Sequence, residues 1–115
     1  MSDQTVDREV LACVADDYMG LWEVARVVGR RMARAAFPEI KAEAMKVLTR
    51  LYSAGYIEAG NLTEEGAFLP WALAPSQALN KIQGEWDRLG RLPDIGEIAW
   101  LNLTPSGEER LQNQN

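Results

Sequence analysis

Histidine is absent from this 115-residue chain, and cysteine occurs only once, at Cys13. The lack of histidine removes the commonest general base and the commonest transition-metal ligand, and it excludes Ser/His/Asp and Cys/His nucleophilic machinery. A single cysteine cannot form a disulfide within the chain, so a cytoplasmic setting is the default expectation. We therefore predict a protein that is not an enzyme and that uses no metal and no cofactor.

Other familiar signals are missing as well. No run of about 18 to 20 apolar residues is present, and the first ten residues contain neither a basic segment nor an apolar one, so we expect no membrane span and no secretion signal. The nine glycines form neither G-x-G-x-x-G nor a P-loop. Acidic residues are adjacent at 16–17, 64–65 and 108–109, but sequence neighbours point apart on a helix, so these pairs do not predict a catalytic acid and base.

The composition is that of one ordinary domain, residues 1–115, because 47% of the residues are hydrophobic and four are tryptophan. The net charge is −5, which disfavours attraction to phosphates. The charge is segregated, however. Residues 21–50 contain seven basic and three acidic side chains, a net charge of +4, which leaves −9 for the remainder.

The first half of the chain predicts three helices. The first covers about residues 5–17, and Cys13 falls on its apolar stripe, which indicates a core residue rather than a reactive thiol. Residues 18–20 are expected to form a turn. The second helix covers residues 21–35, and its polar face carries Arg26, Arg30 and Arg34 at a spacing of four, either as a phosphate-contacting stripe or as a solvated face.

The third helix has the clearest amphipathic pattern. Phe37 and Pro38 mark its start, and Gly55 is the expected cap at its end. Its predicted exposed face is small and mildly polar, consisting of Ala42, Met45, Lys46, Thr49 and Ser53.

Two strands are predicted after this helix, at residues 56–59 and 97–104. Ile98, Trp100 and Leu103 cannot share one face of the second strand, which indicates a bulge or a strand covered on both sides. A last short helix is expected at residues 105–112, beginning at the Thr-Pro-Ser-Gly turn.

A long insert, residues 60–96, separates the two predicted strands. It contains a predicted helix capped by Ser76, with Leu79, Ile82, Trp86 and Leu89 on one face. Its aromatic content indicates that the insert packs, either onto its own chain or as an interface with a partner. The candidate interface residues are Phe68, Trp71, Leu79, Ile82 and Trp86.

Two motifs in this pattern resemble winged helix-turn-helix regulators of the PadR and MarR kinds. The first is the L-x-x-L-x-x-x-G-Y-I junction that runs from Leu48 to Ile57, and the second is W-x-x-L-T-P-x-G-x-x-x-L, from Trp100 to Leu111. The resemblance implies an α+β, mostly helical fold with a three-helix core, a two-stranded antiparallel wing and, unusually, a helical insert in that wing.

The resemblance also implies a way of binding DNA, in which the third helix enters a major groove, the second braces it over the phosphates, and the strands carry a wing toward the backbone or the minor groove. Carried onto this chain, it names Lys46, Thr49 and Arg50 as groove candidates, and Arg26, Arg30 and Arg34 as phosphate candidates. The expected function is a small transcriptional regulator that binds double-stranded DNA as a homodimer, with the insert helix around Trp86 as the dimer seam. The alternative is a protein-binding module on the same scaffold, an accessory or immunity-like protein without DNA binding, whose acidic surface meets a basic partner.

Overall fold

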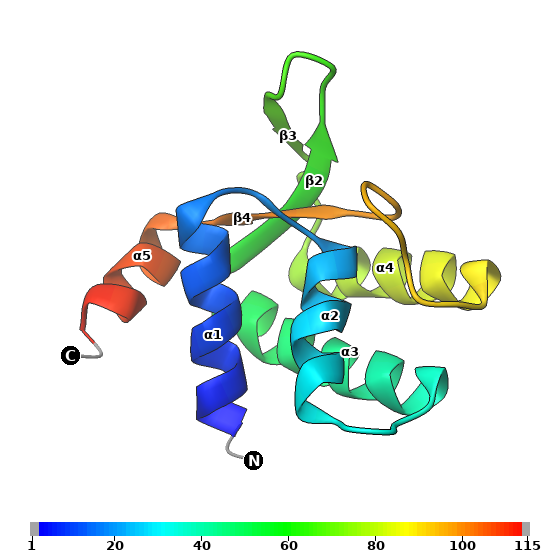
Figure 1. Ribbon diagram of the computed structural model, residues 1–115. Helices are drawn as coiled ribbons and strands as arrows, with labels where there is room; N and C mark the ends of the chain where they lie inside the picture. The colour runs from blue at the N-terminus through cyan, green and yellow to red at the C-terminus, as the bar shows by residue number, and fades with distance from the viewer. Residues whose placement is uncertain (1–2, 114–115) are drawn as a thin grey trace.

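One antiparallel sheet of four short strands organises the fold, and most of the helices lie on one side of it (Figure 1). The structure is a computed structural model that describes residues 3–113. The helices are α1 (Asp3–Asp16), α2 (Leu21–Arg31), α3 (Phe37–Ser53), α4 (Pro75–Leu89) and α5 (Pro105–Gln112). The strands are β1 (Met19–Gly20), β2 (Ile57–Leu62), β3 (Phe68–Pro70) and β4 (Trp100–Leu103). The predicted α+β class is thus confirmed.

The sheet is larger than the two strands expected from the sequence. Its order is β1-β4-β2-β3, with β4 and β2 at its centre, paired from Ile57↔Leu103 to Gly60↔Trp100. The turn expected at residues 18–20 is instead β1, because Met19 and Gly20 pair with Leu101 and Trp100. The pairing strand, β4, is some eighty positions away in the sequence, and a strand of two residues has no recognisable sequence pattern of its own.

The third strand arises inside the insert. β2 continues two residues past Gly60 and turns back into β3, so that Leu62 pairs with Phe68. The turn is closed by the Thr63 side chain, whose hydroxyl oxygen accepts from the N–H of Ala67, and by Gly66 with φ +85°. The hairpin of β2 and β3 projects from the body of the molecule (Figure 1).

The strand β4 is shorter than predicted, so Ile98 does not belong to it and need not share a face with Trp100 or Leu103. Ile98 has φ +71°, which breaks the extended backbone, so β4 starts at Trp100 rather than at residue 97. Leu101 then points into the core, while Trp100 and Asn102 point to the opposite face.

Two predicted helix boundaries are wrong. α2 ends at Arg31, four residues before the expected end, and Arg34 lies in the following turn with φ +67°. α4 starts at Pro75, and its N-terminal turn is held by Gln77, whose side-chain oxygen accepts from the Ala74 N–H, rather than by Ser76. A proline at the first position of α4 or the second position of α3, with a side-chain acceptor three residues after the cap, sets the start of each helix.

The insert helix belongs to the core. Ala78, Ile82 and Trp86 of α4 are fully buried, and α4 packs along α3, where Asp87 accepts a hydrogen bond from Lys41. α1 contributes Val6, Val10 and Val14 to the same core, and Cys13, predicted as a core residue, is partly buried and packs at its border.

The two sequence motifs meet at a junction between the end of α3 and the start of α5. After α3, the Gly55 and Tyr56 N–H groups donate back to the carbonyls of Tyr52 and Leu51, which closes the helix with Gly55 at φ +80°. Thr104 then binds this turn: its N–H donates to the Tyr56 carbonyl at 3.0 Å, and its hydroxyl donates to the Gly55 carbonyl. The same hydroxyl accepts from the Gly107 N–H at 3.1 Å and thereby caps α5.

Gly107 is required at this junction because a Cβ at that position would lie 2.2 Å from the Tyr56 carbonyl oxygen. We expect Gly107→Ala to lower the free energy of unfolding by about 2 kcal/mol, since the contact is with backbone that cannot move alone. Gly84→Ala in α4 is the matched control, because its Cβ would meet no atom closer than 3.9 Å. We expect that change to stabilise the chain by about 0.5 kcal/mol. Urea unfolding of both variants measures the difference, and equal effects would contradict this account of the junction.

The indole N–H groups of Trp86 and Trp22 differ in whether they form a hydrogen bond. Trp86 is fully buried and donates from Nε1 to the Arg91 carbonyl at 3.0 Å. Trp22, in the first turn of α2, has a buried Nε1 that no hydrogen-bond acceptor meets within residues 3–113. An unsatisfied buried donor is destabilising, so the two indoles contribute differently to stability.

We therefore expect Trp22→Phe to change the free energy of unfolding by less than about 1 kcal/mol, because the lost contacts are offset by removal of the unsatisfied donor. Trp86→Phe should lower it by about 2 to 3 kcal/mol, since it leaves both a cavity and an unpaired carbonyl. Thermal or urea unfolding followed by far-UV circular dichroism tests this order. A larger loss for Trp22→Phe than for Trp86→Phe would overturn it.

Candidate functional site

The exposed face of α3 is close to the one expected from the sequence. Ala42, Lys46, Thr49 and Ser53 are exposed, whereas Met45 packs partly against the core. The Lys46 side chain is 68% exposed, and its Nζ lies 3.8 Å from a Glu43 oxygen in the adjacent turn. The Thr49 hydroxyl donates to the Met45 carbonyl at 2.7 Å, which leaves its lone pairs facing outward as acceptors.

Arg50 does not belong to this exposed face. Its Nε and Nη2 each donate to one carboxylate oxygen of Asp7 in α1, both at 2.9 Å. The guanidinium and the carboxylate are both planar and form two parallel hydrogen bonds, and the pair is partly buried. It therefore links α1 to α3. The assignment of Arg50 to a DNA groove is therefore corrected: its guanidinium faces α1.

The arginines of α2 do not form one stripe. Arg26 lies over the Trp22 ring, with its guanidinium carbon 5.5 Å from the ring centroid. Arg30 is 63% exposed and lies 3.5 Å from a Glu9 oxygen in α1, and Arg31 binds the other oxygen of Glu9. The continuous helical stripe predicted through Arg34 is wrong, since α2 has ended by then, although Arg34 is exposed beside the turn.

The candidate interface residues of the insert divide into two groups. Ile82 and Trp86 are completely buried within their own chain, so the predicted dimer seam on this helix is corrected: its apolar stripe is covered by α3. Leu79 packs partly against the core. Phe68 and Trp71 are half-buried; Trp71 donates from Nε1 to Asn61 at 2.8 Å, and Lys81 lies over its ring.

The tip of the β2–β3 hairpin is acidic. Glu64 and Glu65 are exposed in the turn that follows β2, and the tip, residues 63–67, contains no basic residue. In the DNA-binding arrangement implied by the resemblance, this is the part that approaches the phosphate backbone, so the two carboxylates oppose such an approach.

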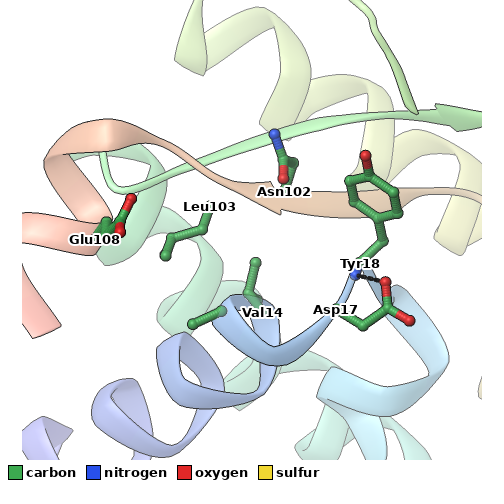
Figure 2. A pocket seen from close by; sticks show the side chains of 7 residues that line it. Val14, Asp17, Tyr18, Asn102, Leu103 and Glu108 are labelled. Carbon is green, nitrogen blue, oxygen red and sulfur yellow. Dashed lines mark hydrogen bonds between the residues drawn. The ribbon is translucent and has the colours of Figure 1, made fainter. Parts of the chain in front are cut away.

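A hollow of about 430 Å³ opens between the end of α1, β4 and the start of α5 (Figure 2). Its walls carry carboxylates, an aromatic ring and aliphatic groups, from Val14, Ala15, Asp17, Tyr18, Asn102, Leu103 and Glu108. Asp17 accepts from the Tyr18 N–H at 2.7 Å, and Asn102 donates to Glu58 of β2 at 3.2 Å. The sequence analysis did not predict this hollow, although one member of each acidic pair at 16–17 and 108–109 lines it.

Cys13 has no sign of a reactive thiol. Burial raises its pKa, and the nearby carboxylates of Glu9 and Glu23 raise it further, so the protonated form dominates at neutral pH. Across residues 3–113, no three Cys, Asp or Glu side chains gather as they would around a metal ion. None of the helices in that range combines the length and the apolarity that a membrane crossing requires.

Comparison with protein-family models, with curated proteins and with solved structures finds no significant match. The assignment of function therefore depends on the surfaces of this chain itself.

Proposed function

We propose that this chain is a winged-helix DNA-binding protein that presents the exposed face of α3 to a major groove. The observation that carries the proposal is the topology. Three helices are followed by strands that return beside them, and β1, between α1 and α2, pairs with β4, which in turn pairs with β2 directly after α3. In this order α3 packs against α1 and α2, and β2 follows it directly and contacts it.

The chemistry of α3 supports close approach to DNA. Beyond its first turn, α3 exposes three small residues, Ala42, Thr49 and Ser53, and one long cation, Lys46, none of which is covered by α4 packing along α3. Small side chains let the helix backbone approach base edges, and the Thr49 oxygen supplies an acceptor there. The exposed Lys46 ammonium, on a longer side chain, reaches a phosphate at the edge of the groove.

The charges support a modest affinity. Arg26, Arg30, Arg34 and Lys46 are exposed cations on α2, the α2–α3 turn and α3, whereas Arg50 is held by Asp7. Glu9 offsets part of the charge of Arg30 and Arg31. These four cations supply four phosphate contacts per chain. A homodimer in the cytoplasm would make eight contacts with a palindromic site.

The first test is fluorescence anisotropy of a labelled random duplex at about 50 mM and 200 mM salt. With four phosphate contacts per chain, the slope of log affinity against log salt should be about −3.6, which is a loss of about a hundredfold over that range. Replacing Arg26, Arg30 and Arg34 together by alanine should reduce the slope to about −1. Arg8→Ala on α1 is the control and should leave the slope unchanged. An unaltered slope in the triple variant would remove these arginines from the proposal.

Glu9 provides a test in the opposite direction. Glu9→Gln removes the carboxylate that pairs with both Arg30 and Arg31, so DNA affinity at 50 mM salt should rise by about two- to fivefold. Glu85→Gln, which frees Lys81 on α4 and changes the net charge equally, is the matched control. Equal gains from the two variants would indicate only a change in overall charge, and no gain from Glu9→Gln would contradict a phosphate contact at Arg30.

A protein-binding module is the second candidate, and the acidic hairpin tip favours it. Glu64 and Glu65 oppose phosphates at the position where a wing contacts DNA. Absence of DNA binding at 50 mM salt in both the natural chain and Glu9→Gln would make this second function the better supported one.

A further inference from the structure

The face of the sheet that points away from the helices carries an aromatic surface. Ile57, Ala59 and Leu101 are buried toward the helices, so the alternating positions Glu58, Gly60, Trp100 and Asn102 lie on the opposite, outer face. Helices α1 to α4 all lie on the other side of the sheet (Figure 1).

One row of residues crosses all four strands of this outer face. The strand register joins Gly20 to Trp100, Trp100 to Gly60, and Gly60 to Pro70. The two glycines leave room for neighbouring rings to lie flat on the backbone. A Cβ at Gly20 would lie 2.6 Å from the Trp22 ring, and a Cβ at Gly60 would lie 2.8 Å from the Phe68 ring.

Tyr18 completes this surface. It precedes β1 on the outer face and stacks on Phe68 from β3, with ring centroids 5.3 Å apart and an angle of 18° between the rings. We refer to Tyr18, Trp22, Phe68 and Trp100 together as the aromatic layer. All four are half-buried, so the layer retains exposed ring area that no helix of the described chain covers.

The surroundings of the aromatic layer are acidic. Glu58 lies on the outer face beside Asn102, and Asp17 and Glu108 line the adjoining hollow, where Tyr18 forms one wall (Figure 2). Glu23 follows Trp22 in α2 and is partly buried. Arg26 lies over the Trp22 ring, so the chain already places one guanidinium on the layer.

We infer that the aromatic layer and the adjoining hollow bind an extended, arginine- or lysine-bearing segment of a partner protein. Half-exposed rings attract guanidinium and ammonium groups through their negative faces, and the carboxylates around them pair with the same cations. The hollow of about 430 Å³ has room for one long side chain between Asp17 and Glu108. Nucleic acid is disfavoured here because the carboxylates repel phosphates, and a purely apolar partner would leave those carboxylates desolvated.

This surface shares only Arg26 with the residues proposed to contact DNA, so the two proposals can fail separately. The basic partner segment would bind on the sheet, whereas DNA would bind at α3 on the helical side. Binding of a peptide to the outer face can be measured without DNA, so such a measurement tests this face separately from α3.

The probe is a synthetic peptide of alternating arginine and glycine, RGRGRGR, added to the ¹⁵N-labelled full chain. The indole N–H signals of the four tryptophans can be compared within one spectrum. Trp22 and Trp100 belong to the aromatic layer, whereas Trp86 is buried on the other side of the sheet and Trp71 lies beyond β3. We expect the Trp100 indole and the backbone amides of Tyr18 and Asn102 to shift with peptide, while the Trp86 indole stays constant. No shift at Trp100, or equal shifts produced by an alternating glutamate and glycine peptide, would overturn the inference.

Matched variants locate the carboxylates. Asp17→Asn with Glu108→Gln removes the two charges that line the hollow and keeps the oxygen that accepts from the Tyr18 N–H. The control is Asp16→Asn with Glu109→Gln, which removes the same charge from the neighbouring exposed positions outside the hollow. We expect about fivefold weaker peptide binding in the first pair and less than about twofold in the second. Equal weakening in both pairs, or a shift of the Trp100 indole signal on addition of a short single-stranded oligonucleotide without peptide, would contradict a basic protein segment as the occupant.

Discussion

The contact on which the rest of the structure depends is the junction between the end of α3 and the start of α5. Thr104 donates two hydrogen bonds to the carbonyls of Gly55 and Tyr56 and accepts one from Gly107. These bonds align β2 with β4, and a shift of one residue in that register would move every side chain to the opposite face of the sheet. The division between a buried face with Ile57 and Leu101 and an outer face with Glu58 and Trp100 follows from it.

The insert changes what the scaffold exposes. Its helix α4 packs along α3 with Ile82 and Trp86 fully buried, so the most hydrophobic part of the insert serves the core of its own chain. Its hairpin, by contrast, extends the sheet with β3 and places Phe68 over Gly60 and against Tyr18. The insert thereby closes one side of α3 and builds an aromatic surface on the far side of the sheet.

Ion pairs distribute the charge of the chain between these surfaces. Asp7 and Glu9 of α1 bind Arg50, Arg30 and Arg31, and Asp87 of α4 binds Lys41. The basic excess of residues 21–50 is therefore partly neutralised by α1 and α4, and the exposed cations that remain are few. Around the outer face, the carboxylates of Asp17, Glu58 and Glu108 have fewer basic partners, so more of the acidic charge is left there. The result is a chain with two surfaces of different chemistry, one proposed for phosphates and one for basic side chains.

Local signals in the sequence were sufficient for the elements that depend on periodicity and capping. The apolar stripe of α1, the apolar repeat of α3 with its proline start and glycine end, and the Thr-Pro-Ser-Gly start of α5 all predicted what the structure contains. Helices form from contacts three and four residues apart, so such signals are local. Only the tertiary structure decided the rest. The strand at Met19–Gly20 forms because β4 lies beside it, α2 stops at Arg31 where the chain must turn toward α3, and Arg50 faces Asp7 from a different helix. The hollow and the aromatic layer bring together residues that are more than ninety positions apart, and no local pattern in the sequence spans such a separation. The sequence by itself therefore determined the helices and the class of fold, whereas the pairing of distant groups, which sets the chemistry of each surface, was decided by packing.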